Sequence, residues 1–237
     1  MSTQQTQRLG LPLVQAAQAQ KHVTVNESLA RLDGLVNLVL LSASRAGPPV
    51  AVVEGSCYGV PSGAGEAWAG QDGRIAIASN GGWVFVDAQA GMRAFVVDAG
   101  SQAIHDGTGW IEGAMTLGAF GSALAARVAE TEVAVSAGTS MTTDLVIPNS
   151  AMVIGATARV SEALTGTLSS WAMGTEGATD RFGSSLGIQQ GSWARGMLSQ
   201  PFTYWSPAPV ILTATGGAFA GGKVRLAVHW LELTLPR

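Results

Sequence analysis

The chain has 237 residues, of which 31 are glycine, 47% are hydrophobic and 12% are charged, and its mean hydropathy is +0.27. The net charge is −3, and no basic stripe is present, so we expect no nucleic-acid partner. The polar opening MSTQQTQRLG has no signal-peptide core, and no apolar run approaches the length of a membrane span. These features predict a β-rich protein that is made in the cytoplasm, does not insert into a membrane and oligomerises through a weakly charged surface.

The stretch Leu9–Val36 has the densest local signals in the chain. Gly10 and Pro12 interrupt regular structure, so the letters LGLPL predict an extended arm. The Ala- and Gln-rich segment Val14–Lys21 predicts a first short helix with hardly any apolar face. An arm and a helix of this kind bury little surface by themselves, so we expect other chains to bury them.

A second short helix is predicted directly afterwards. Thr24 followed by Glu27 is a capping-box pattern, which predicts that the helix starts there. Four apolar residues then fall on one helical face: Leu29, Leu32, Leu35 and Val36.

The letters QAAQAQKHVTVNESLARLD, which run from Gln15 to Asp33, closely resemble the opening of a family of domains in alphaproteobacterial phage and gene-transfer-agent proteins. Members of that family are tail fibres and head spikes, and their pattern reads much like LPLVQAAQAQKHVTVNE followed by an Ala/Arg-Leu-Asp helix. Roughly twenty consecutive positions match in type, and the resemblance continues more loosely to about Trp110. It implies a virion appendage subunit, located in the particle, that binds other spike, fibre, capsid or tail proteins. We expect a homo-oligomer, with a trimer favoured.

The remainder of the N-terminal half predicts short strands and two hairpins. Each hairpin is a strand, a Gly-containing turn and a Trp that enters the next strand. The hairpins are expected at 75–86 and 103–111, and the other strands at Asn37–Ser42, Val50–Val53, Cys57–Val60 and Met92–Val97.

Three tryptophans and one cysteine in this half allow two interpretations each. Trp68, Trp83 and Trp110 are either sugar-stacking platforms or anchors of a small core, and the core role is favoured because Trp is usually buried. Cys57, the only cysteine, excludes an intrachain disulfide and is either a small buried filler, which we favour, or a reactive thiol.

A change in composition at Leu117–Glu132 predicts the domain boundary. Ser122–Glu132 favours helix, either as a short connector or as a stalk on a trimer axis. The predicted organisation is therefore an N-terminal attachment domain at 1–116, a connector at 117–132 and a C-terminal domain at 133–237.

The C-terminal half predicts an antiparallel β-sandwich or jelly roll, so the fold class is mainly β with short N-terminal helices. In the strand at 152–160, the apolar face is expected to contain Met152, Ile154, Ala156, Ala158 and Val160. In the last strand the apolar residues alternate on one face up to Trp230 and on the opposite face from Leu231 to Leu235, which predicts either a β-bulge or a change of burial near Trp230. Further strands are expected at Thr143–Ile147, Leu168–Met173 and Val210–Thr215. This half, with RFGSSLGI and GGKVRLAVHW, also resembles the C-terminal modules of phage tail fibres.

The best candidate for ligand contact is a predicted long loop, Thr175–Gln200. Amide, guanidinium and carboxylate groups can bond sugar hydroxyls, while an aromatic ring covers the apolar face of a sugar. The alternative is a loop that packs against a neighbouring subunit. The candidate ligand-binding residues are Asp180, Gln190, Trp193 and Arg195.

No catalytic motif is present, so we expect neither an enzyme nor a cofactor. His22, His105 and His229 lack metal-ligand spacing, and no metal site is predicted. The favoured function is a spike or fibre subunit that docks by its N-terminal part and adheres to host cell-surface or capsular polysaccharide. The alternatives are a purely structural adaptor, or a depolymerase that uses carboxylates among Glu162, Glu176 and Asp180.

Overall fold

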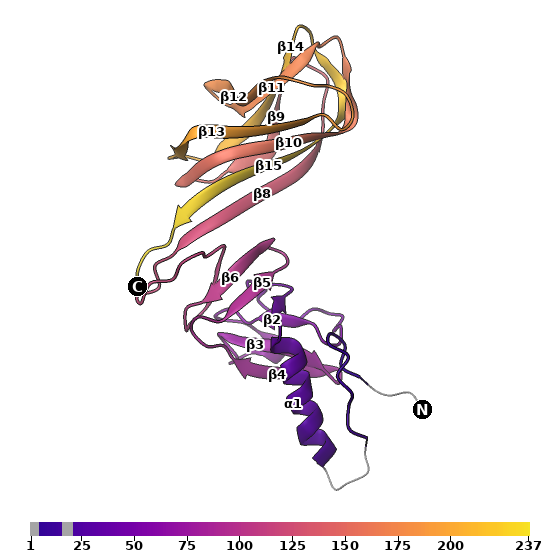
Figure 1. The fold of residues 1–237 in the computed structure, drawn as a ribbon, viewed down its shortest axis with the longest axis vertical. Coiled ribbons are helices and arrows are strands. Elements are labelled where there is room, and N and C mark those ends of the chain that lie inside the picture. The colour runs from indigo at the N-terminus through magenta and orange to yellow at the C-terminus, as the bar shows by residue number, and fades with distance from the viewer. Residues whose placement is uncertain (1–4, 16–20) are drawn as a thin grey trace. The chain divides into compact units, whose positions relative to one another are not determined.

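A computed structural model describes residues 5–15 and 21–237. The chain divides into two compact units, Met1–Ala125 with Thr234–Arg237 (the N-terminal unit) and Ala126–Leu233 (the C-terminal unit). The predicted mainly β fold is confirmed, and Figure 1 shows one labelled α-helix, α1, among the strands of the described residues. No helix in this described part is long and apolar enough to cross a membrane.

The first half contains α1 (Lys21–Leu35), β1 (Val39–Leu40), β2 (Cys57–Gly59), η1 (Glu66–Trp68), β3 (Arg74–Ser79), β4 (Gly82–Asp87), β5 (Arg93–Val96), β6 (Ser101–His105) and β7 (Trp110–Glu112). The second half contains β8 (Leu124–Ala134), β9 (Ser140–Ile147), β10 (Ala151–Gly166), β11 (Ser170–Thr175), β12 (Ala178–Leu186), β13 (Trp193–Tyr204), β14 (Ala208–Thr215) and β15 (Phe219–Leu233).

The helix α1 begins earlier than predicted. Thr24 lies inside α1, where its carbonyl accepts a bond from the Ser28 hydroxyl at 2.9 Å, so the predicted capping-box start is wrong. The residues just before Thr24 include no helix breaker, and the helix therefore extends back to Lys21. Of the first predicted helix, Val14 and Gln15 are not helical, and residues 16–20 lie outside the described residues.

The segment 5–15, which we call the arm, includes the predicted LGLPL but is not simply extended: residues 7–9 form a turn, and Gln5 pairs with Pro12 in an antiparallel bridge. The arm lies against α1, and a buried carboxylate holds it there. Asp33 is only 3% exposed. Its Oδ1 accepts bonds from the Thr6 hydroxyl at 2.7 Å and the Leu9 amide at 2.6 Å, and its Oδ2 accepts one from the Arg8 amide at 3.1 Å. Three donors of the arm thus converge on one side chain.

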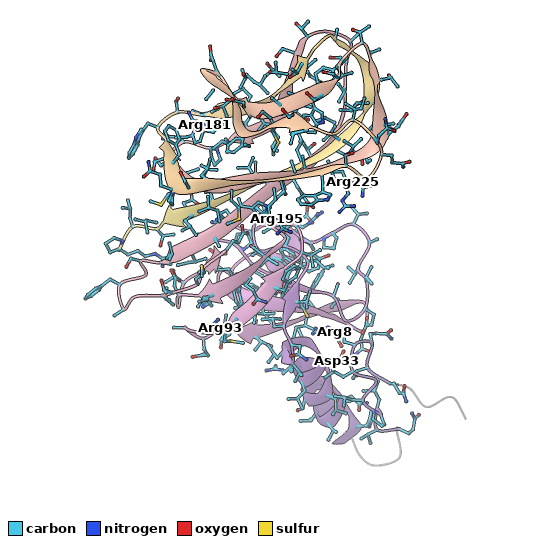
Figure 2. All side chains as sticks on the ribbon, turned by 45° about the horizontal axis from the view of Figure 1, so that its top comes forward. Arg8, Asp33, Arg93, Arg181, Arg195 and Arg225 are labelled. Carbon is cyan, nitrogen blue, oxygen red and sulfur yellow. The ribbon has the colours of Figure 1, made fainter. Side chains whose placement is uncertain are left out.

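The Arg8 side chain also caps the C-terminal end of α1. Its guanidinium donates to the carbonyl oxygens of Asp33 and Gly34, each at 2.7 Å, and to that of Asn37 at 2.8 Å. The last carbonyls of a helix lack partners within the helix, and a cation there also meets the negative end of the helix dipole. Figure 2 labels Arg8 and Asp33 beside this end of α1.

Two small sheets complete the N-terminal unit, in the orders β2-β3-β4 and β1-β5-β6-β7. Both predicted hairpins are confirmed, as β3 pairs with β4 and β6 pairs with β7. The strand predicted at Val50–Val53 is wrong, because this segment follows Pro48-Pro49, is irregular and leaves Val50 fully exposed.

The core role favoured for the tryptophans is confirmed. Trp68 is fully buried and packs against Tyr58 and Trp83, with each pair of ring centroids 5.3 Å apart. Trp110 packs partly buried against the core around Ile75. Cys57 is also buried, as expected for a filler.

The last four residues, Thr234–Arg237, belong to the N-terminal unit. The Thr234 amide donates to the Ala123 carbonyl at 2.9 Å, and the Arg237 guanidinium forms an ion pair with Asp106, whose side chain is buried. Burial raises the pKa of Asp106, but the hydrogen bonds from Thr108 and Gly109, together with Arg237, outweigh it and lower the pKa below its usual value.

The connector helix predicted at Ser122–Glu132 is wrong, because this segment lies in β8 from Leu124 onward. Along β8, buried Val133 alternates with exposed Glu130 and Glu132, and the strand pairs with β15 in its sheet. The sheet gives every second residue a core contact, which outweighs a local helix preference.

The C-terminal unit is the predicted antiparallel sandwich, with sheets in the orders β13-β10-β15-β8 and β12-β11-β14-β9 (Figure 1). Their facing sides share one core, which includes Val153, Val160, Trp171, Phe182 and Leu212. Hydrophobic side chains from both sheets thus close the layer between them.

A bulge changes which residues of β10 face the core. The pairing of β10 with both neighbours shifts between Val153 and Gly155. Met152 and Ile154 therefore lie exposed, whereas the prediction placed them with Ala156 on the apolar face. Both alternatives offered for the region near Trp230 are present: this bulge of β10 lies opposite His229 and Trp230 of β15, and burial also changes along β15, where Leu233 is exposed.

Candidate ligand-binding face

The segment Thr175–Gln200 is not the long loop that the sequence predicts. It contains β12 and most of β13, joined by residues 187–192. Gly196 serves close backbone approach, because a Cβ on it would lie 1.9 Å from the Phe182 carbonyl oxygen of β12. Glycine here allows β12 and β13 to lie side by side.

The structure brings two of the four predicted ligand residues together. Trp193 and Arg195 are on β13; the Trp193 side chain is 64% exposed, and the Arg195 guanidinium lies 5.8 Å from its ring centroid. Gln190, in the connection before β13, donates its amide to the Ser161 carbonyl at 3.0 Å. Asp180 lies exposed on β12, which belongs to the other sheet.

Trp193 and Arg195 form part of the outer face of the sheet β13-β10-β15-β8. In the register of this sheet, Arg159 of β10 lies directly opposite Trp193 and, on its other side, opposite Arg225 of β15. On the next outward-facing rung, Thr157 of β10 lies opposite Arg195. Figure 2 labels Arg195 and Arg225 on this sheet.

A hollow of about 740 Å³ lies over these rungs. Its lining combines an indole ring, three guanidinium groups, two carboxylates and two threonine side chains. The lining residues are Glu130, Thr131, Glu132, Thr157, Ala158, Arg159, Trp193, Ala194, Arg195, Arg225, Leu226 and Ala227. We call this surface the arginine face.

The charges of the arginine face are only partly compensated. Arg225 donates to Glu132 at 2.6 Å, and this hydrogen bond lowers the pKa of the Glu132 carboxyl. Arg159 and Arg195 have no ion-pair partner within the described ranges 5–15 and 21–237. The face therefore presents guanidinium groups that are available to an anionic ligand.

Sequence reasoning missed Arg159, Arg225 and Glu132 as members of a site. Arg159 and Arg225 lie on the polar face of predicted strands, which is a visible signal, whereas Glu132 lies in the predicted connector helix. Neither position tells which residues lie opposite one another. Only the register of the sheet brings residues 132, 159, 193 and 225 together.

Other candidate chemistry is dispersed. Across the residues that the structure describes, no group of three His, Cys, Asp or Glu side chains is placed to hold a metal ion. Glu162 forms an ion pair with Lys223 at 3.4 Å, and Glu176 lies exposed between β11 and β12. His229 lies within 3.4 Å of the Thr157 hydroxyl, and burial lowers the pKa of His105.

Residues 25–111 match the family model described as a protein of unknown function, DUF2793. This DUF2793 segment covers α1 from Val25 onward and all strands through β6. It ends near Trp110, where the resemblance to the spike and fibre proteins also ends. No curated protein matches the chain.

Solved phage structures also match. A chain of the cyanophage Pam1 capsid asymmetric unit is 26% identical, with 45% of this chain and 84% of that chain covered and a TM-score of 0.35. A chain of the acidic stable capsid structure of Helicobacter pylori bacteriophage KHP30 is 14% identical, with 45% and 97% covered and a TM-score of 0.31.

Proposed function

We propose that the chain is a structural subunit of a phage or gene-transfer-agent particle, a head spike or tail fibre component that docks through its N-terminal unit. The observation that supports this most directly is the nature of Leu9–Val36. This stretch resembles the opening of spike and fibre proteins, overlaps the DUF2793 segment, and forms the arm and helix described above. The proposed role is non-catalytic and needs no cofactor.

The outward side of α1 provides a docking surface for this role. One apolar stripe is formed by Val25, Leu29 and Leu32 of α1 and by Val36, which directly follows the helix, because these residues are spaced by 4, 3 and 4. Three of them are exposed, with Leu32 at 52%. The arm lies on Asn26 and Asp33 and leaves this stripe accessible. An apolar stripe of this spacing is the kind that helices bury against a partner chain.

The test is the variant Leu32→Glu, which keeps a good helix former and places a charge in the stripe. We expect the purified variant to be folded, because Leu32 is half exposed, and particles to incorporate at least tenfold less of it. Val50→Glu is the matched control, since Val50 is an exposed apolar residue outside the helix. Normal incorporation of Leu32→Glu would refute docking through α1.

A second, adhesive function is favoured by the exposed Trp193 ring beside Arg195 over the hollow of the arginine face. A ring and hydrogen-bonding groups on one open surface suit a cell-surface polysaccharide. Truncation of a stacking aromatic costs about 1–3 kcal/mol of binding, and several subunits multiply that loss. Trp193→Ala should therefore abolish particle adsorption to cells without lowering incorporation.

The outcome also separates the alternatives. Normal adsorption of Trp193→Ala particles would favour a purely structural adaptor. Loss of incorporation would indicate that Trp193 packs between subunits. Release of reducing ends from host polysaccharide by purified protein would favour a depolymerase.

A further inference from the structure

The arginine face contains a charge arrangement that a sheet avoids unless something stabilises it. Arg159 and Arg225 lie directly opposite each other on neighbouring strands, and like charges in this position repel. Glu132 compensates Arg225 alone, at 2.6 Å. Arg195, on the next outward rung of β13, adds a third guanidinium to the same hollow.

The groups beside these arginines indicate which anion fits. Trp193 lies directly opposite Arg159, and its exposed ring gives an apolar surface next to a guanidinium. Thr157, Glu130 and Glu132 line the same hollow and can bond hydroxyl groups. A ligand that uses the whole face has an apolar side, several hydroxyls and an acidic group, which are the features of an acidic sugar.

Two negative charges in the hollow disfavour a nucleic acid as the ligand. Glu130 and Glu132 lie among the arginines, and the chain as a whole has a net charge of −3. A nucleic-acid backbone places phosphates in a continuous row, and its binding depends on a surface of mainly positive charge. The spaced carboxylates of an acidic sugar chain can meet the arginines, while its hydroxyl groups lie beside the glutamates.

We propose that the arginine face binds an acidic polysaccharide, with Arg159, Arg195 and Arg225 holding sugar carboxylates and Trp193 stacking on a sugar ring. This inference rests on the adhesive role proposed above and adds to it the charge of the ligand and three further residues, Arg159, Arg225 and Glu132. Arginine suits the task because its planar guanidinium can bond both oxygens of a carboxylate.

The experiment measures binding of the purified full-length protein to alginate, a polymer of uronic acids, and to dextran, a neutral polymer. We expect alginate binding that weakens with salt, and much weaker dextran binding. Arg159→Ala and Arg195→Ala should each lower alginate affinity about tenfold, and Arg159→Lys should lower it less, because it keeps the charge and loses the bidentate geometry. Arg93→Ala is the matched control, since Arg93 is an exposed arginine of β5 in the other unit.

Three results would overturn the inference: equal binding of dextran and alginate, unchanged alginate binding by Arg159→Ala, or double-stranded DNA bound as tightly as alginate. Circular dichroism verifies that each variant is folded. Particle incorporation is measured separately. If docking through α1 fails but alginate binding is intact, the proposal that the arginine face binds an acidic polysaccharide still holds.

Discussion

Substitution of Asp33 tests whether one carboxylate holds the arm on α1. Asp33→Ala removes the acceptor for the Thr6 hydroxyl and the Arg8 and Leu9 amides, which bond it at 2.6 to 3.1 Å. Hydrogen bonds to a charged group contribute about 1.5–3 kcal/mol each, but they are not additive, and the released donors return to water. We therefore expect a total loss of about 1.5–3 kcal/mol, which shifts the docked arm toward release about 10- to 100-fold.

Hydrogen exchange at the Arg8 and Leu9 amides measures this shift directly. Both amides should exchange about 10- to 100-fold faster in Asp33→Ala, since their protection requires the docked arm. The strands of the N-terminal unit should keep their protection, because their own ladders hold them and the arm forms no part of those ladders. Asp98→Ala, which removes an exposed carboxylate of the same unit, is the control. Exchange of the Leu9 amide at the wild-type rate would show that Asp33 does not hold the arm.

Three further predictions concern stability. Burial raises the pKa of Cys57 from 9.0 to about 11, so the contribution of the neutral thiol to the free energy of unfolding is complete below pH 9 and is lost as pH rises toward 11. Cys57→Ala should remove this pH dependence from an alkaline unfolding curve. The lowered pKa of Asp106 acts in the opposite direction, so the contribution of its carboxylate to the free energy of unfolding is complete above about pH 3.8 and is lost as pH falls further. Asp106→Asn should therefore make stability depend less on pH in this acid range. Gly196→Ala places a Cβ 1.9 Å from the Phe182 carbonyl oxygen and should cost about 3 kcal/mol in thermal unfolding, whereas Ser199→Ala on the same strand should cost little.

Local chemistry made the β3–β4 hairpin predictable. Asn80 and Gly81 have φ values of +53° and +72°, and they join two strands whose interiors, residues 75–78 and 83–86, are apolar. A two-residue hairpin turn with both φ values positive favours the Asn-Gly pair, so these two letters contain most of the information about the hairpin. The arm was predictable for a similar reason, because Gly10 and Pro12 exclude a helix there.

The error at β8 has a long-range cause. The Ala-rich segment around Arg127 has helix-forming composition, but Arg127 bonds Glu232 of β15, which is more than a hundred positions later. Pairing across that separation decides the conformation of the segment, and no local window contains it. The parity change near Trp230 predicts a bulge there as one alternative, but it does not place the extra residue in β10, between Val153 and Gly155, because a bulge is defined by the partners of a strand.

The candidate site was predictable only as far as its residue types. Trp193 and Arg195 stood out because an indole and a guanidinium occur two positions apart in a polar, Gly-rich segment. Two positions apart on a strand means the same face, so their proximity follows from the strand once β13 is known. A single loop would place Asp180 close to Trp193 and Arg195. The segment instead forms β12 and β13, which belong to different sheets, and Asp180 is therefore separated from Trp193 and Arg195.

The opposition of Arg159 and Arg225 conflicts with the local rules that otherwise describe the sandwich. Along both strands the inward residues are apolar and close-packed, as a stable fold requires. The outward residues could have had opposite charges in the same register at no cost to the core, and Glu132 beside Arg225 shows that this sheet accommodates such a pair. The proposed anionic ligand would account for a repulsive pair next to an exposed tryptophan, because its negative charge would convert the repulsion into attraction.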